Sequence, residues 1–509
     1  MQRMETGKGI LKAAIMICLS SVFLYFAVFN LGNEAISNWD EARHGISAYE
    51  MMQSGNYICN TFNYAPDEWN LKPPLSFWAI AASFAVNGYT LLALRLPSCI
   101  CLVLTFFLLS RRMFRSHGFI SGCAFMLLFE AFGDLFFVHY GRSADADAIY
   151  ILFFVCAMLL LPVAEQKRER PRIRYALAGL CASLAFLAKS FHAFTILAIL
   201  VAYAVISQDY KRLGMKGIAC ACLCAAAPVL IWGAWRYAYD QWDFLGNMFG
   251  VDVINRIEDG MENARVGTQS TFFQYLTGYR PTQLLIILII VCALIIGISR
   301  RMSPAKAILS RPEKRTCILL GLWIVLPFIM YSLSSTGCTW YYYPTIIALI
   351  VAASALLGKC ISTLRAMPKG VVKKTSLAAF CAVLLCGLTY QVRMIGQNAD
   401  RVRHCAEDKT QQALRMWFDR GSEYTGRNAY IQEDLTETSY RDIGQWEQAD
   451  ILAAELFADF RCQDGGIEGF LTDSGALLLV SRRQYGEHIQ ALDGKRVLLQ
   501  NEEYFVFEN

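Results

Sequence analysis

Charged residues are scarce in this chain. Asp, Glu, Lys and Arg make up only 17% of its 509 residues, whereas hydrophobic residues make up 55%. The mean hydropathy is +0.35, which is high for a chain of this length. This balance excludes an ordinary soluble globular protein and indicates a chain that spends most of its length in a membrane.

Signatures of nucleotide and zinc binding are also missing. The sequence contains no glycine-rich dinucleotide fingerprint and no P-loop. Its 18 cysteines include no C-x-x-C pair and no Cys/His set with zinc-ligand spacing. Most of them lie in apolar runs, where cysteine behaves as a small hydrophobic residue. A nucleotide-dependent enzyme and a structural zinc domain are therefore not indicated.

Apolar runs of membrane-spanning length recur over the first four-fifths of the chain. Six basic clusters between alternate runs hold more than half of the 47 Lys and Arg residues. Basic short loops stay cytoplasmic, so the loop 32–92, Asp147, the loop 239–281 and the residues after about 395 are expected outside. We expect eleven spans, near residues 11–31, 93–110, 117–138, 148–164, 175–189, 191–207, 217–238, 282–299, 316–334, 342–358 and 375–394.

The composition becomes polar after the last expected span. Helical spacing alternates with strand patterns there, with helices expected at 409–419 and 447–460 and strands at 428–432, 476–481 and 496–507. The sequence thus predicts a membrane domain at 1–394 and a small extracytoplasmic α/β domain at 395–509.

The outer loop 32–92 carries the most informative residues. Pro73 and Pro74 are suited to the first turn of a helix, so a helix is expected at 75–86, with Lys72 beside its positive end. Such a place attracts a phosphate or carboxylate. Apolar residues at helical spacing in Asp40–Ser54, closed by Gly55, predict an amphipathic helix that lies in the membrane interface.

A series of motifs in this order resembles a known family. They are Asn38-Trp39-Asp40-Glu41-Ala42-Arg43, Met51–Gly55, Lys72-Pro73-Pro74-Leu75, Leu94-Arg95-Leu96-Pro97-Ser98, Arg142, Asp147-Ala148, Leu177-Ala178-Gly179, Ala188-Lys189, Leu326-Pro327-Phe328, Ser332-Leu333-Ser334, Tyr341 and Pro344. The chain resembles the polyprenyl-phosphate-sugar-dependent glycosyltransferases of the GT-C fold over about residues 10–360, in particular bacterial aminoarabinose transferases and protein O-mannosyltransferases. The resemblance implies an all-α polytopic membrane fold with external juxtamembrane helices.

The resemblance implies roles for the acidic residues. Asp40 would be the catalytic carboxylate, acting as general base on the acceptor or orienting it, with Glu41 as a second acid. Asp147 would be the second external acid, and Asp145 competes for that role. The alternative for Asp40 is a helix N-cap. Arg43, in the same motif, is a further candidate site residue.

The resemblance also implies a set of residues at the lipid phosphate of the donor. Lys72 would neutralise that phosphate, although a snorkelling lysine would look the same. Arg256 would join it, with Arg265 and Arg280 as competitors. Tyr341 would touch the phosphate or belong to an interfacial aromatic belt. Lys189 matches a family lysine or caps a turn.

Two departures from the family pattern concern a metal. Close aminoarabinose transferases have an acid directly before the lysine, where this chain has Leu71, and a histidine in the long external loop, where residues 239–281 have none. We therefore assign no metal ligands and expect no required cofactor, while a divalent metal stays an open alternative.

The sequence thus predicts a glycosyltransferase of a bacterial inner membrane with an extracytoplasmic active site. Its partners would be a polyprenyl-phosphate sugar donor and a lipid, glycan or protein acceptor, with no nucleic acid. Attack on the sugar C1 would invert the anomeric centre. The alternative is a transporter or flippase for a lipid-linked sugar, without covalent chemistry.

Overall fold

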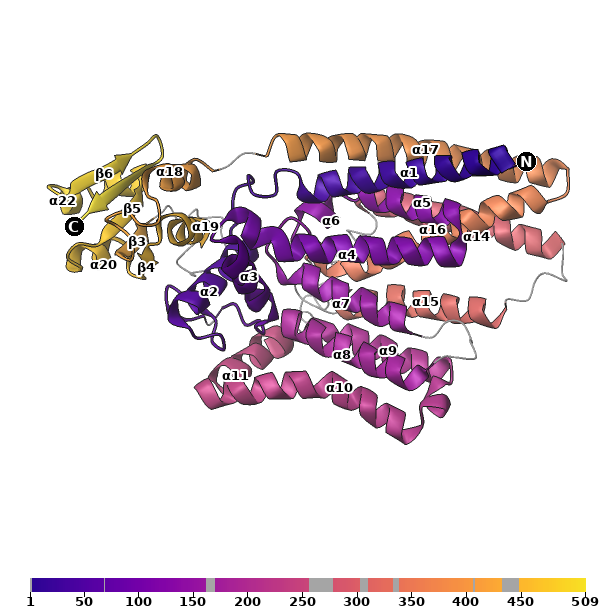
Figure 1. Ribbon diagram of the computed structural model, residues 1–509, viewed down its shortest axis with the longest axis horizontal. Helices are drawn as coiled ribbons and strands as arrows, with labels where there is room; N and C mark the ends of the chain where they lie inside the picture. The colour runs from indigo at the N-terminus through magenta and orange to yellow at the C-terminus, as the bar shows by residue number, and fades with distance from the viewer. Residues whose placement is uncertain are drawn as a thin grey trace, which may run out of the picture.

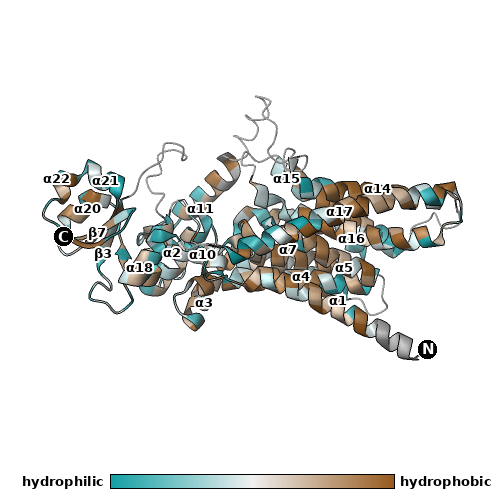
Figure 2. Ribbon diagram, turned by 90° about the horizontal axis from the view of Figure 1, so that it is seen from above, coloured by the Kyte–Doolittle hydropathy of each residue, from teal (hydrophilic) through white to brown (hydrophobic). Residues whose placement is uncertain are grey.

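The computed structural model describes residues 2–67, 69–161, 170–255, 278–302, 310–332, 338–405, 408–432 and 448–509. Long helices lie side by side in an elongated body, and a small α/β domain lies at one end of it (Figure 1). The N-terminus lies at the opposite end of the body (Figure 1). Apolar residues dominate the body, whereas polar residues are frequent in the small domain (Figure 2).

Eight helical stretches among the described residues are long and apolar enough to cross a membrane. They are Gly9–Val28 in α1 (Gln2–Val28), α4 (Leu91–His117), Pro171–Ile206 comprising α8 (Pro171–Lys189) and α9 (Phe194–Ile206), α10 (Asp209–Asp240), α14 (Arg280–Met302), α15 (Arg311–Ser332), Thr339–Ala366 ending in α16 (Tyr343–Ala366), and α17 (Val371–Arg403). The protein is therefore a multi-pass membrane protein.

Shorter apolar helices occupy other expected spans. They are α5 (Phe119–Glu130), followed by α6 (Asp134–Phe137), and α7 (Ala146–Leu160). A 3-10 turn at Ser190–Ala193 separates α8 from α9, directly after Lys189, where the sequence analysis expected a turn. The number of eleven spans stays a prediction, since these short helices do not by themselves establish a crossing.

Aromatic side chains fill the centre of the helical body. Phe23 of α1 stacks on Phe106 of α4 with ring centroids 3.7 Å apart. Phe129 of α5 and Phe136 of α6 contact the Phe23 ring edge-on or tilted. This core fixes α1, α4, α5 and α6 against one another, and the segments that connect them at the domain end carry the polar residues described below.

The outer loop folds into two helices and a short hairpin. The helix α2 (Asp40–Ser54) ends at Gly55, which adopts the left-handed conformation with φ 71°. The helix α3 (Leu75–Asn87) begins directly after the two prolines. Between them lies a hairpin of β1 (Thr61–Phe62) and β2 (Ala65–Pro66). Both expected helices are therefore present at the expected positions.

The environment of α2 differs from the expectation. All residues from Glu41 to Met51 are buried, including the polar ones, so other parts of the protein cover both faces of α2. The helix α19 (Gln448–Ala453) packs on the face of α2 that carries Ala42, Gly45 and Ile46, and the π turn Ala454–Ala458 of the C-terminal domain contacts α2 as well. On the polar face, Ser47 donates to the Thr61 carbonyl and Glu50 accepts the Tyr64 N–H. The position of α2 at the membrane interface stays a prediction, but the helix leaves no face uncovered between Glu41 and Met51.

The C-terminal domain is built on a five-stranded mixed sheet in the order β4-β3-β5-β7-β6. The strand β3 (Asn428–Gln432) pairs in parallel with β4 (Arg461–Cys462) and with β5 (Leu477–Ser481). The strand β7 (Tyr504–Glu508) runs antiparallel to both of its neighbours, β5 and β6 (Arg496–Gln500). Its helices are α18 (Lys409–Trp417), α19, α20 (Gly466–Thr472), α21 (Arg482–Glu487) and α22 (Ile489–Leu492). The expected strand 496–507 is a hairpin, because Asn501 accepts the N–H groups of Glu503 and Tyr504 and turns the chain.

Two buried carboxyl groups meet where α2 contacts the C-terminal domain. Glu50 of α2 and Glu455 are both 0% exposed. Two buried carboxylates close together repel each other, which favours a proton on one of them. Burial is the main cause that raises the pKa of Glu50 to about 7 and the pKa of Glu455 well above its ordinary value. The folded protein therefore binds a proton here that the unfolded chain releases.

Glu50→Gln is expected to flatten the pH dependence of stability. Because the folded pKa of Glu50 is raised, its stabilising contribution is complete below about pH 4.5 and is lost as the pH rises through about 7. The loss amounts to about 3 kcal/mol, which the amide avoids because it needs no proton to donate. Thermal unfolding in detergent at pH 5 and pH 8 measures it, with the exposed Glu423→Gln as control. Equal pH slopes in the wild type and Glu50→Gln would contradict this account.

Candidate active site

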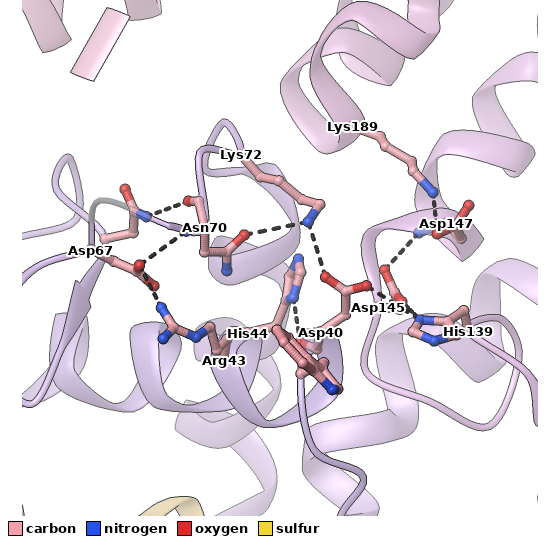
Figure 3. Close-up of polar contacts among 12 residues, drawn as sticks. Asp40, Arg43, His44, Asp67, Asn70, Lys72, His139, Asp145, Asp147 and Lys189 are labelled. Carbon is pink, nitrogen blue, oxygen red and sulfur yellow. Dashed lines mark hydrogen bonds and ion pairs between the residues drawn. The ribbon is translucent and has the colours of Figure 1, made fainter. Parts of the chain in front are cut away.

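Asp40 and Lys72 meet at the domain end of the helical body. The Lys72 Nζ lies 3.0 Å from the Asp40 Oδ1, and the two side chains are 20% and 17% exposed. Asp40 is the first residue of α2, and Lys72 precedes the first turn of α3 (Figure 3). Both side chains are buried enough to be held in place and exposed enough to reach a ligand.

Asp67 shapes the loop that carries Lys72. Its Oδ1 accepts the backbone N–H groups of Trp69 and Asn70, each at 2.9 Å. Arg43 of α2 forms an ion pair with the same oxygen at 2.6 Å. The guanidinium of Arg43 also lies over the Trp69 ring, 4.8 Å from its centroid. Arg43 thus ties the loop to α2 and holds Lys72 near Asp40 (Figure 3).

His139 connects Asp40 to a second carboxylate. Its Nδ1 lies 2.6 Å from the Asp145 Oδ2 and 3.3 Å from the Asp40 Oδ2. Asp145 is also the N-cap of α7 and accepts the backbone N–H of Asp147. Trp340 stacks on the His139 ring with centroids 3.8 Å apart. His139 therefore lies between two acids under an aromatic face.

Opposite charges set the protonation of this cluster. Burial raises the pKa of Asp40, but Lys72 and His139 outweigh it and hold that pKa well below its ordinary value. Burial lowers the pKa of His139, yet its bonds to Asp145 and Asp40 raise it to about 10. Burial and Asp40 raise the pKa of Asp145, and His139 brings it below its ordinary value. At neutral pH we therefore expect two carboxylates held by an ammonium and an imidazolium.

Asp147 lies beside this cluster but has its own partner. Its Oδ2 forms an ion pair with the Nζ of Lys189, the last residue of α8, and both side chains are buried. The Lys189 Nζ lies 4.9 Å from the centroid of the Tyr341 ring. Of the two candidate acids, Asp145 is therefore the one near Asp40, and Tyr341 lies near Lys189.

Glu41 does not join the cluster. Its carboxylate forms a two-pronged ion pair with Arg95 of α4, at 2.7 and 3.0 Å. It also accepts the backbone N–H groups of Ser37 and Ala144. These bonds occupy both oxygens, and the side chain is buried. Glu41 thus links α2 to α4, and neither of its oxygens is available to bind a substrate.

The structure thus brings together only part of the set that the sequence predicted. Asp40, Lys72 and Asp145 meet, Asp147 and Lys189 form an adjacent pair, and Arg256 lies outside the described residues. His139 was not predicted, and Trp340 was considered only as part of an aromatic belt at residues 340–343. His139 is one of six histidines in the chain and follows an apolar run, on the side that the basic clusters predict to be outside, and this is the signal that could have found it.

The cluster also has the donor atoms of a metal site. One ligand atom each from Asp40, His139 and Asp145 lies within 4.8 Å of the others. Two carboxylate oxygens and an imidazole nitrogen suit a divalent cation. The arrangement can therefore bind positive charge, accept a proton on Asp40, and attract an anion through Lys72.

Comparison with known proteins gives several relatives. The family model described as dolichyl-phosphate-mannose-protein mannosyltransferase matches residues 71–232. An undecaprenyl phosphate-alpha-4-amino-4-deoxy-L-arabinose arabinosyl transferase of Pseudomonas savastanoi pv. phaseolicola is 26% identical over 345 residues, covering 67% of this chain and 60% of that protein. Its counterpart in Aeromonas salmonicida is 27% identical over 352 residues, with 66% and 58% covered. The chain thus spans about three-fifths of the length of these curated relatives.

The similarity to solved structures extends over nearly the whole chain. The crystal structure of ArnT from Cupriavidus metallidurans bound to undecaprenyl phosphate has a TM-score of 0.64 and 14% identity, covering 99% of this chain and 98% of that one. The apo form of the same protein has a TM-score of 0.60. The expected fold class, a helical membrane body with a small C-terminal α/β domain, is confirmed. The resemblance to aminoarabinose transferases and mannosyltransferases is confirmed as well.

Proposed function

We propose that this protein is a membrane glycosyltransferase that moves a monosaccharide from a polyprenyl-phosphate donor to a lipid, glycan or protein acceptor. The observation that carries the proposal is the cluster in which Lys72 and His139 flank the Asp40 carboxylate. The names of the relatives support a donor of this chemical class. No observation favours the transporter alternative.

Lys72 has the task of stabilising the leaving group. As the bond between the sugar C1 and the phosphate oxygen breaks, negative charge develops on the polyprenyl phosphate. A cation placed at that oxygen lowers the energy of the transition state more than that of the bound donor. Lys72 is partly exposed and precedes the positive end of α3, so an anion placed there meets both.

Asp40 accepts the proton of the acceptor. The acceptor hydroxyl or amine attacks C1 from the face opposite the phosphate, its proton passes to Asp40, and the electrons of the broken bond leave with the phosphate. The anomeric centre is inverted. In the free protein Lys72 weakens the basicity of Asp40. A donor phosphate that draws Lys72 to itself would remove part of this effect, so the base becomes stronger once the donor is bound.

We propose that no metal is required, because the Lys72 ammonium and the His139 imidazolium balance the two carboxylates of the cluster. The donor set of Asp40, His139 and Asp145 nevertheless fits a divalent ion. When bound, such an ion would supply positive charge beside the sugar phosphate. His139 supplies positive charge at the same place when it is protonated, which its raised pKa of about 10 favours at neutral pH.

We further propose a bacterial inner-membrane location with the cluster on the extracytoplasmic face. The alternating basic clusters of the sequence support this orientation. The helix α2, which begins with Asp40, and the C-terminal domain lie at the same end of the helical body, opposite the N-terminus (Figure 1). An extracytoplasmic site suits a lipid-linked donor, since nucleotide sugars are not available there.

Release of free polyprenyl phosphate tests the function. Purified protein in detergent is given polyprenyl-phosphate-linked 4-amino-4-deoxyarabinose or mannose with a membrane lipid and glycan extract. Thin-layer chromatography measures the lipid product, and mass spectrometry measures the glycosylated acceptor. We expect release that needs acceptor and persists at full rate in excess EDTA. Loss of release in EDTA would overturn the metal-independent mechanism. Movement of intact donor across a vesicle bilayer without release would overturn the transferase.

A further inference from the structure

The C-terminal domain contacts the residues directly before Asp40. The Gln448 Oε1 accepts the backbone N–H of Trp39 at 2.8 Å. The Asn38 Oδ1 accepts the backbone N–H of Ala449 at 2.8 Å. Gln448 and Ala449 are the first residues of α19, so each segment supplies a hydrogen bond to the start of the other. The two contacting segments are about 400 residues apart in the sequence.

A second glutamine holds the same segment from α18. The Gln411 Oε1 accepts the backbone N–H of Ile36 at 2.8 Å, and its Nε2 donates to the Ile36 carbonyl at 3.4 Å. Gln411 and Gln448 are 4% and 2% exposed. Buried amides paired with backbone groups are costly to leave unpaired. The segment 36–39 is therefore fixed by the C-terminal domain at both ends.

Trp39 needs such support because its backbone is strained. It has φ 71° and ψ −124°, outside the regions that a residue with a side chain ordinarily adopts. Conformations of this kind cost about 1–3 kcal/mol and persist only where the surroundings enforce them. Its own side chain gives α2 no capping bond. The backbone of Trp39 sets the direction in which the chain enters α2 at Asp40.

Tight packing joins α19 to α2 beyond the hydrogen bonds. A Cβ atom added to Gly45 would lie 2.4 Å from the Leu452 Cδ2, so α19 approaches α2 as closely as a glycine permits. Leu452 is fully buried. Its core cluster includes Ala42, Ile46 and Leu94 from the membrane-side segments. The contact is therefore a shared core rather than a loose attachment.

We propose that Gln448 is a positioning residue for Asp40, through which the C-terminal domain completes the active site. This inference rests on the proposed function. Without the bond from Trp39 N–H to Gln448, Trp39 relaxes toward an ordinary conformation and turns the first residue of α2. Asp40 then leaves the place between Lys72 and His139, while Lys72 keeps its own support from Asp67 and Asn70.

The variants Gln448→Leu and Gln448→Glu distinguish loss of the hydrogen bond to Trp39 from a mere change of side chain at this position. Leucine removes the acceptor, and we expect kcat to fall about 100-fold, the usual cost of a misplacement near 1 Å. The KM for the donor should change little, because Lys72 stays in place. Glutamate keeps an oxygen for the Trp39 N–H and lies at the positive end of α19, so it should restore most of kcat.

A core variant of the same domain serves as the matched control. Val480→Ala removes two methyl groups from the far side of the sheet, in the cluster of Phe470 and Phe507, away from residues 36–39. It should lower the unfolding temperature and leave kcat near the wild-type value below that temperature. An equal loss of kcat in Val480→Ala and Gln448→Leu would assign the effect to stability and overturn the inference.

Hydrogen exchange at the Trp39 amide tests the contact without any substrate. Exchange of a peptide covering residues 36–45, followed by mass spectrometry, should accelerate in Gln448→Leu and stay slow in Gln448→Glu. Faster exchange with an unchanged kcat would overturn the positioning role. Unchanged exchange in Gln448→Leu would overturn the contact itself. If the wild type transfers no sugar while exchange responds as expected, the proposed function fails and the contact stands.

Discussion

Asp40→Asn is expected to lower the rate of sugar transfer by about 1,000-fold, because a positioned general base contributes about 100- to 10,000-fold. The amide keeps the size of the side chain but cannot take the acceptor proton. Binding of the donor should persist, since Lys72 remains. Single-turnover measurements of released polyprenyl phosphate would record the loss. A rate within about tenfold of the wild type would exclude Asp40 as the base.

Two acidic variants sharpen this test. Asp400→Asn removes an exposed carboxylate at the end of α17, where it pairs with His404, and should leave the rate unchanged. Glu41→Gln, one residue from Asp40, breaks the buried pair with Arg95 and should lower the unfolding temperature. Below that temperature its rate should exceed that of Asp40→Asn. The reverse order would return Glu41 to the catalytic role that the sequence suggested.

Lys72→Ala is expected to weaken transfer by about 10- to 100-fold and to change its pH dependence. A hydrogen bond to a charged group contributes about 1.5–3 kcal/mol, and Lys72 would make it with the donor phosphate. Lys72 also lowers the pKa of Asp40, so its removal raises that pKa. The acidic limb of the profile of kcat/KM against pH should therefore move to higher pH.

The control for Lys72→Ala is Lys409→Ala, which removes a surface lysine of the C-terminal domain whose partners are Glu502 and Glu503. Its profile should match that of the wild type. Lys72→Arg keeps the positive charge and should keep the position of the acidic limb while the rate falls moderately, because guanidinium geometry differs. If the acidic limb of the Lys72→Ala profile stays at the wild-type pH, Lys72 does not control the pKa of the catalytic base.

Local sequence signals predicted the helices of the outer loop well. Asp40–Ser54 ends at Gly55 because only a residue without a side chain takes φ 71° there at no cost. The helix α3 starts after Pro74 because proline fits a first turn. These signals lie within a few residues of what they determine. The ordered motifs in turn predicted the fold class and assigned Asp40 and Lys72 to one active site.

Tertiary contacts determined the burial of α2 and the partners of the acidic residues, which local sequence patterns do not predict. The polar face of α2 is as buried as its apolar face, because the hairpin loop covers it at Ser47 and Glu50, while α19, about 400 residues away in the chain, packs on the apolar face. Glu41 and Asp40 are neighbours with different partners, since successive helical positions point about 100° apart. His139 reaches the cluster only because the turn after α6 brings it between α2 and α7.

The sequence by itself determined that the chain crosses a membrane repeatedly, because apolar length and basic loops act residue by residue. It also determined that Asp40 stands at the start of α2 and that Lys72 stands just before α3. Only the tertiary structure decided that Asp145 and His139 complete the group and that Gln448 holds the residue before Asp40. Such contacts depend on how distant helices pack, which no short stretch of sequence encodes.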